Sequence, residues 1–271
     1  MGCIITLDNT IKERYGSVLG RYDGILLCSD FDGTLCNHKD VSRENCEAIK
    51  YFQENGGLFS LASGRFPSIL DEMKDYFVPN TYSVHLNGSM IYDYTNKKSV
   101  YEGILTEDIF DFSYELLKEI PKIVEVIFYT YDEFLIFEQK RNDYKQFCSE
   151  LKKPIFKVVY KVLAKDSDFI TEQIRKATAG KYNIGRSWVN GIELQSINDS
   201  KGLAVNRLRK MLGSRAEKVV CVGDYENDIS MLEIADFSYA VDNAVDGVKA
   251  VADKITVANT ENAIEKIIYE L

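Results

Sequence analysis

Residues 24–34 read Gly-Ile-Leu-Leu-Cys-Ser-Asp-Phe-Asp-Gly-Thr. The continuous apolar run at 25–28 is typical of a strand that is buried on both faces of a parallel sheet. The run ends abruptly at two carboxylates, Asp30 and Asp32. Because ligands bind beyond the carboxyl ends of the strands in open α/β sheets, this stretch predicts both a parallel sheet and a binding site at its edge.

Strands and helices continue to alternate after this stretch. An amphipathic helical pattern from Ser42 leads to an apolar strand at 58–63, and a helix at about 67–76 leads to a strand at 81–86. The same alternation resumes after Ser200. This order predicts an α/β fold with a doubly wound parallel sheet.

Between these two parts the sequence changes to shorter strands that are rich in aromatic residues. We expect this segment to be an inserted α/β domain. The predicted organisation is an N-terminal extension at 1–22, a core at 23–88 and 197–271, and the inserted domain at 89–196. Asn87-Gly88, at the first boundary, is also a strong hairpin signal, so an ordinary turn remains an alternative to a functional role there.

The composition limits the classes of function. The chain has 271 residues, of which 45% are hydrophobic, and a net charge of -9, as in an ordered globular protein whose field repels nucleic acid. It contains no apolar run of the roughly 18 residues that a membrane-spanning helix needs. The six cysteines form no C-x-x-C pair, which favours reduced thiols and a cytoplasmic location. We expect no nucleic-acid partner, no membrane association and a monomer.

Polar signatures follow several predicted strands, and the doubly wound order brings them to one edge of the sheet. One more signature, Ser200-Lys201-Gly202, opens the first helix after the insertion. The signatures at strand ends are Asp30-Phe31-Asp32-Gly33-Thr34, Ser63-Gly64-Arg65, Asn87-Gly88 and Gly223-Asp224-Tyr225-Glu226-Asn227-Asp228.

Carboxylates gathered in one crevice call for a cation, because each pair at about 4 Å repels by roughly 4 kcal/mol at intermediate dielectric. Oxygen ligands in octahedral geometry favour Mg²⁺. Calcium is the alternative, since Asp-x-Asp-Gly resembles the start of an EF-hand loop. The spacing excludes it, because Leu35 and Val41 occupy the positions, counted from Asp30, where that loop needs glycine and glutamate.

In this order, the signatures resemble those of the haloacid dehalogenase (HAD) superfamily of phosphohydrolases, and in particular its Cof-type branch. The resemblance covers the chain from about Asp23 onward. It implies a Rossmann-like core with an inserted α/β cap domain. It also implies a Mg²⁺-dependent phosphatase that hydrolyses small phosphomonoesters, sugar phosphates or similar metabolites, through an aspartyl-phosphate.

The resemblance also implies a role for each matching residue. Asp30 is the expected nucleophile, and Asp32 is the general acid and base, which also gives the metal its backbone carbonyl. Ser63 and Lys201 hold the phosphoryl oxygens. Asp224 completes the metal ligands, which are therefore Asp30, Asp32 and Asp224.

Further residues have supporting roles in the same family pattern. Asp228 orients Lys201 or a metal-bound water, and Asn243 braces the loop. The expected substrate- and phosphate-binding residues are Phe31, Gly64, Arg65, Asn87 and Asn227.

Two other functions remain open from the sequence. A sugar phosphomutase uses the same two aspartates and differs in whether the cap holds the intermediate for return. A catalytically idle phosphate-binding regulatory module would be marked by the loss of Asp30 or Asp32, and both are present. Tyr225 departs from the family pattern, because relatives tend to carry a small residue after the metal-binding aspartate, and its bulky ring is expected to narrow the site.

Overall fold

The computed structural model describes the chain except for residues 1–19, 38–39, 69–76 and 139–142. Most of the predicted N-terminal extension and of the helix predicted at about 67–76 lies outside the described residues. Within the described ranges, no helix combines the length and the apolar composition needed to cross a membrane.

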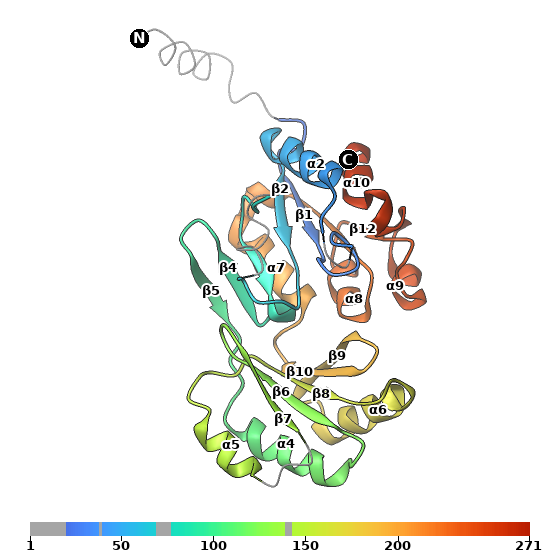
Figure 1. The fold of residues 1–271 in the computed structure, drawn as a ribbon. Coiled ribbons are helices and arrows are strands. Elements are labelled where there is room, and N and C mark those ends of the chain that lie inside the picture. Colours follow the sequence, from blue (N-terminus) through green and yellow to red (C-terminus); the bar gives the residue numbers. More distant parts are fainter. Residues whose placement is uncertain (1–19, 38–39, 69–76, 139–142) are drawn as a thin grey trace.

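A parallel five-stranded sheet forms the core of the molecule (Figure 1). Its strand order is β13-β12-β11-β1-β2, and all neighbouring pairs are parallel. The strands are β1 (Ile25–Ser29), β2 (Leu58–Leu61), β11 (Lys218–Gly223), β12 (Phe237–Ala240) and β13 (Lys254–Ile255).

Helices pack around this sheet in pairs, with α2 beside α10 and α7 beside α8 (Figure 1). Their bounds are α2 (Arg43–Glu54), α7 (Lys201–Leu212), α8 (Ile229–Leu232), α9 (Asp246–Val251) and α10 (Ala263–Glu270). The predicted doubly wound core is therefore confirmed.

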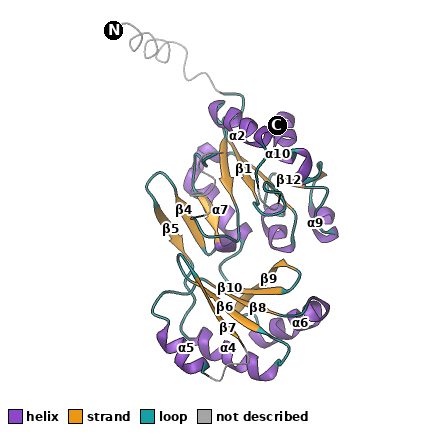
Figure 2. Cartoon of the chain, viewed as in Figure 1, coloured by secondary structure: helices purple, strands orange, loops and turns teal. Residues whose placement is uncertain are grey.

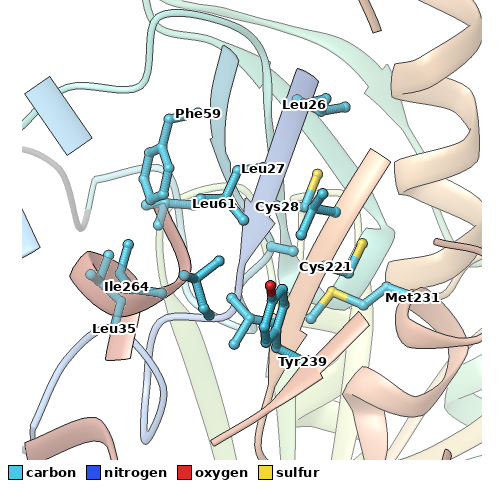
Figure 3. Packing of buried hydrophobic residues seen from close by; sticks show 14 of the residues in the cluster. Leu26, Leu27, Cys28, Leu35, Phe59, Leu61, Cys221, Met231, Tyr239 and Ile264 are labelled. Carbon is cyan, nitrogen blue, oxygen red and sulfur yellow. The ribbon is translucent and has the colours of Figure 1, made fainter. Parts of the chain in front are cut away.

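The predicted first strand, β1, is an interior strand of this sheet and lies between β11 and β2. Leu26, Leu27 and Cys28 have no exposed surface. Figure 3 shows them among side chains from the neighbouring strands and helices, including Phe59 and Met231. This burial on both faces explains why the strand reads as a continuous apolar run.

A three-stranded antiparallel sheet, β3-β4-β5, lies beside the core. It contains β3 (Ser83–His85), β4 (Met90–Asp93) and β5 (Lys98–Glu102). The strand predicted at 81–86 therefore pairs mainly with β4, and one parallel bridge, Ala62 to Val84, connects it to the end of β2. Strand β4, which falls within the segment predicted as the insertion at 89–196, likewise belongs to this small sheet.

Left-handed backbone at the turn between β3 and β4 reverses the chain. Leu86 and Asn87 have φ of 50° and 54°, and Gly88 has φ of 105°. Side chains other than glycine rarely adopt this conformation, and asparagine tolerates it best. The hairpin turn that Asn87-Gly88 indicated is thus present between β3 and β4.

The inserted segment forms a second five-stranded sheet of order β7-β6-β8-β10-β9, whose neighbouring pairs are antiparallel. Its strands are β6 (Glu125–Tyr129), β7 (Phe134–Glu138), β8 (Lys157–Lys161), β9 (Tyr182–Trp188) and β10 (Gly191–Ser196).

The helices of the insertion cover one face of this sheet and share a separate hydrophobic cluster with it. Figure 2 shows them on the side away from the core. They are α4 (Asp108–Glu119), α5 (Tyr144–Glu150) and α6 (Ser167–Thr178). The inserted α/β cap is thus present, and its exact boundaries stay predictions.

His85 gives the fold a pH-dependent stability. The ring has no exposed surface; its Nδ1 lies 3.2 Å from the carbonyl oxygen of Arg65, and its Nε2 lies 2.7 Å from the Tyr94 hydroxyl. Burial lowers the pKa of His85 from 6.5 to about 4. Between these values the unfolded chain binds a proton that the folded chain does not bind.

The free energy of unfolding should therefore fall as the pH drops from 6.5 to 4, by up to roughly 3 kcal/mol from this residue. Urea denaturation of the wild type and of His85→Gln across this range measures the contribution. The variant should lose stability less steeply than the wild type. Parallel pH profiles for the two proteins would contradict the prediction.

Candidate active site

The two loops that carry most of the predicted site lie side by side because β1 and β11 are parallel neighbours. Asp30 donates its backbone N–H to the carbonyl oxygen of Val222 at 3.0 Å. Gly33 has φ of 88°, and a Cβ there would lie 2.5 Å from a carboxylate oxygen of Asp224. Glycine is therefore required for the close approach of the two loops.

Lys201 lies between two carboxylates at the centre of this arrangement. Its Nζ donates to Oδ1 of Asp30 at 2.5 Å and to Oδ1 of Asp228 at 2.6 Å, and its side chain has no exposed surface. Burial by itself would lower the pKa of Lys201, but the charges of Asp228 and Asp30 outweigh it and raise this pKa. The ammonium is therefore held in its charged form.

The start of α7 fixes the position of Lys201. Ser200 is the N-cap of this helix, and its Oγ accepts the backbone N–H of Leu203 at 3.1 Å. Gly202 lies close to the backbone of Ser230, because a Cβ there would meet that carbonyl oxygen at 2.0 Å. The Ser-Lys-Gly signature thus contains a cap, the ammonium and a close packing contact.

Asp228 connects Lys201 to the second loop. One of its oxygens accepts from Lys201, and the other accepts the backbone N–H groups of Asp224 at 2.9 Å and Tyr225 at 3.1 Å. Its carboxylate therefore fixes both the ammonium and the backbone that carries Asp224.

Asp30, Asp224 and Asp228 form an acidic cluster in which each offers one carboxylate oxygen, all within 4.8 Å of one another. Burial, with the charges of neighbouring carboxylates, raises the pKa of Asp30 well above its usual value and that of Asp224 to about 6. The Thr34 hydroxyl donates to Asp224 at 2.8 Å. The hard oxygen donors and the incompletely balanced negative charge suit a divalent cation such as Mg²⁺.

The Asp32 side chain lies outside this cluster. Arg65 donates to both of its oxygens, from Nε at 2.7 Å and from Nη2 at 2.5 Å. Both side chains are about half exposed, so the pair faces the opening of the site. The Asp32 side chain is therefore engaged by Arg65, and the role of its backbone carbonyl as a metal ligand stays a prediction.

Phe31 and Ser63 are buried beside this pair. The Phe31 ring is 2% exposed and packs in the core cluster, with the Arg65 guanidinium 5.3 Å from its centroid. Phe31 can therefore offer a phosphate only its backbone. Ser63 has no exposed surface, and its Oγ accepts the backbone N–H of Arg65 at 3.1 Å.

Asn87 connects the core to the insertion. Its Nδ2 donates to Oγ of Ser187 at 2.8 Å and to Glu193, and its Oδ1 accepts from Nδ2 of Asn227 at 3.1 Å. A Cβ on Gly64 would lie 3.1 Å from Oδ1 of Asn87. The hairpin turn thus also brings this side chain into the site, so the two interpretations of Asn87-Gly88 are compatible.

Asn243 stabilises the loop that follows β1. Its Nδ2 donates to the carbonyl oxygen of Gly33 at 2.8 Å, and its Oδ1 accepts the backbone N–H of Asn259 at 2.8 Å. The side chain therefore ties the loop after β1 to the C-terminal part of the chain.

A cavity of about 500 Å³ opens beside the acidic cluster, between the core and the insertion. Ser63 and Lys201 are absent from its described lining, and Lys201 instead lines a neighbouring cavity of about 260 Å³. The lining of the larger cavity includes Asp30, Asp32, Gly64, Arg65, Asp224 and Asn227 from the core, and Tyr129, Phe134, Lys157, Ser187, Trp188 and Glu193 from the insertion.

The buried pair of Lys157 and Glu193 was not predicted from the sequence. Nζ of Lys157 lies 3.1 Å from Oε1 of Glu193, and each side chain is 2% exposed. Lys157 Nζ also lies 3.3 Å from the carbonyl oxygen of Gly64 and 4.4 Å from the centroid of the Tyr129 ring. The available signal was a charged residue within each of two apolar strand patterns, because buried charges are rare unless they are paired.

Arg186 holds the insertion over the core loop. Its Nε donates to Oε2 of Glu226 at 3.0 Å, and its Nη1 donates to Asp168 at 2.6 Å. Gln195 adds a hydrogen bond to the carbonyl oxygen of Leu86 at 2.8 Å. The contacts with Glu226 and Leu86 connect the sheet of the insertion to the core loops, and the contact with Asp168 positions the Arg186 side chain within the insertion.

Comparison with known proteins places this geometry in a family. Residues 27–268 match the family model of the haloacid dehalogenase-like hydrolases. YxeH of Bacillus subtilis is 28% identical over 264 residues, which cover 91% of this chain and 97% of YxeH. Its name describes it provisionally as a phosphatase.

Two further similarities agree. YcsE of Bacillus subtilis, named 5-amino-6-(5-phospho-D-ribitylamino)uracil phosphatase, is 26% identical over 245 residues, which cover 90% of this chain and 94% of YcsE. The solved structure of BT4131, a HAD subclass IIB sugar phosphatase, has the same fold with a TM-score of 0.75 at 20% identity, over 90% of this chain and 98% of that one. The chain belongs to the haloacid dehalogenase-like hydrolases, as a Cof-type phosphatase with an inserted α/β cap.

Proposed function

We propose that the protein is a Mg²⁺-dependent phosphatase that hydrolyses small phosphomonoesters, sugar phosphates or similar metabolites, through an aspartyl-phosphate on Asp30. The observation that carries the proposal is the charged Lys201, which is hydrogen-bonded to Asp30 and Asp228 beside Asp224. A cavity large enough for a small metabolite adjoins this group. The phosphatase names of the relatives support the reaction class.

In the first step, a carboxylate oxygen of Asp30 forms a bond to phosphorus, and the bond from phosphorus to the leaving oxygen breaks. Asp32 donates the proton that the leaving oxygen takes up. Arg65 donates hydrogen bonds to both carboxylate oxygens of Asp32. Arg65 must therefore release Asp32 in part, and an oxygen of the entering ester offers its guanidinium another partner.

In the second step, Asp32 takes a proton from water while that water attacks phosphorus. The bond between phosphorus and Asp30 breaks, and inorganic phosphate leaves. Lys201 opposes the negative charge of the phosphoryl group in both steps. Bound Mg²⁺ would neutralise phosphoryl oxygens, and Asp30, Asp224 and the backbone carbonyl of Asp32 are the groups that would hold it.

Removal of the nucleophile tests the proposal directly. Asp30→Asn should lower phosphate release from a panel of phosphomonoesters by at least about a thousandfold, because an amide cannot form the acyl-phosphate. The wild type should also lose activity when a chelator removes Mg²⁺. Asp111→Asn, on the exposed side of α4, is the matched control and should keep wild-type rates. More than a tenth of the wild-type rate in Asp30→Asn would refute the mechanism.

The role of Lys201 is tested separately. Lys201→Met should lower kcat by about a hundredfold or more, because it removes a buried cation that opposes charge on the phosphoryl group. It should also cost roughly 3–5 kcal/mol of stability, since Asp30 and Asp228 lose their partner. Lys210→Met, an exposed position on the same helix, should change neither quantity.

Urea denaturation and phosphate release measured on the same samples separate these two effects of Lys201→Met. Without urea, where Lys201→Met is fully folded, its rate of phosphate release should still be low. A folded Lys201→Met protein with wild-type kcat would contradict the assignment.

A further inference from the structure

Aromatic side chains form much of the cavity wall. They come from both parts of the molecule, because Phe66 and Tyr225 belong to loops of the core and the others to the sheet of the insertion. Ring centroids lie 5.6 Å apart for Phe66 and Tyr129 and 5.8 Å apart for Tyr129 and Phe134. We call these residues the aromatic wall: Phe66, Tyr129, Phe134, Trp188 and Tyr225.

Strand register explains the part of this wall that comes from the insertion. Tyr129 on β6 is paired with Phe134 on β7 and with Lys157 on β8. All three side chains line the cavity, because residues paired across neighbouring strands point to the same face of a sheet. One row across three strands thus presents two rings and an ammonium to the space above Asp30.

Phe134 is 52% exposed although it lies at the cavity. It sits on β7, the edge strand of the sheet. A large exposed ring on a cavity wall contributes little to packing and gains contact area when a ligand covers it. Phe134 is therefore a candidate for ligand contact with little structural role.

Several buried polar groups beside the same wall already have partners, whereas Oδ1 of Asn227 has none among the described residues. Lys157 pairs with Glu193, and Asn87 donates to both Glu193 and Ser187. Asn227 could accept from one hydroxyl, but a leaving group with several hydroxyls would need to break the other contacts or bury most of its hydroxyls without partners. Both outcomes cost binding free energy. The described part of the wall thus suits an apolar, flat group better than a polyhydroxylated one.

We propose that the preferred leaving group carries a flat aromatic or heteroaromatic ring, attached through the carbon that bears the phosphate ester, and that this ring lies against the aromatic wall. The proposal rests on the proposed phosphatase function and narrows its substrate class. Tyr225, which departs from the family pattern, contributes one of the rings. The phosphate remains at Asp30 and Lys201, and the ring lies towards Phe134.

The test compares three primary phosphomonoesters with the full-length protein and Mg²⁺: benzyl phosphate, cyclohexylmethyl phosphate and glucose 6-phosphate. In all three the phosphate is on a CH₂ group, so the leaving oxygens are chemically alike. The first two differ in flatness at similar size. Benzyl phosphate should have a kcat/KM about tenfold above the other two, which is the scale of a favourable ring contact.

Phe134→Ala should remove most of the advantage of benzyl phosphate, mainly through KM, and leave glucose 6-phosphate within about twofold of its wild-type value. Phe169→Ala is the matched control, because Phe169 is 64% exposed on α6 and is not among the described residues that line the cavity. It should leave all three values unchanged. A preference for glucose 6-phosphate, or an equal loss for all esters in Phe134→Ala, would overturn the proposal while leaving the phosphatase function intact.

Binding gives a second measurement that does not depend on turnover. Trp188 is the single tryptophan of the chain and lines the cavity, so its fluorescence reports on the wall. In Asp30→Asn protein, benzyl phosphate should change this emission and bind about tenfold more tightly than glucose 6-phosphate. If benzyl phosphate binds selectively but no ester is hydrolysed by the wild type, the aromatic wall binds a ring as proposed, but the proposed phosphatase function fails. If binding shows no selectivity for the ring, the ring proposal fails.

Discussion

The site depends on one buried cation. The Lys201 ammonium compensates the charges of Asp30 and Asp228 where water cannot do so, and without it the end of β1 and the loop after β11 would bring carboxylates together at a large electrostatic cost. Its position follows from the first turn of α7, which begins directly after the insertion. Lys201 therefore connects helix α7 to the acidic cluster at the edge of the core sheet.

Lys201 neutralises only part of the negative charge of the acidic cluster, and the remaining charge can bind a cation. Burial raises the pKa values of Asp30 and Asp224, and the excess of three carboxylates over one ammonium adds to this effect. The uncompensated negative charge suits a divalent cation. The outer pair, Asp32 and Arg65, is half exposed and can exchange partners when an ester enters. A two-step phosphoryl transfer needs a fixed nucleophile, which the buried cluster around Lys201 provides. It also needs a proton donor and acceptor that can change partners, which the exposed pair of Asp32 and Arg65 allows.

The sequence predicted the core well because local patterns control it. The apolar run before Asp30 and the acidic loop from Asp224 each indicate the end of a strand. Lys201 follows a capping serine and indicates the start of a helix. The partners of Lys157 could not be predicted in the same way, because its contact with Glu193 depends on the pairing of β8 with β10, two strands far apart in the chain. The antiparallel pairing of β3 stayed open in the sequence, because the strand pattern at 81–86 also fits the parallel sheet and only the hairpin signal of Asn87-Gly88 pointed to β4.

The central claim is that the phosphoryl group passes through Asp30. The most direct measurement is mass spectrometry of peptides from protein that is acid-quenched during turnover of a good substrate with Mg²⁺. The account predicts one added phosphoryl group on the peptide that contains Asp30, and its loss when substrate is exhausted before the quench. Phosphoryl transfer to another residue, or none on Asp30 at any time during rapid turnover, would contradict the account.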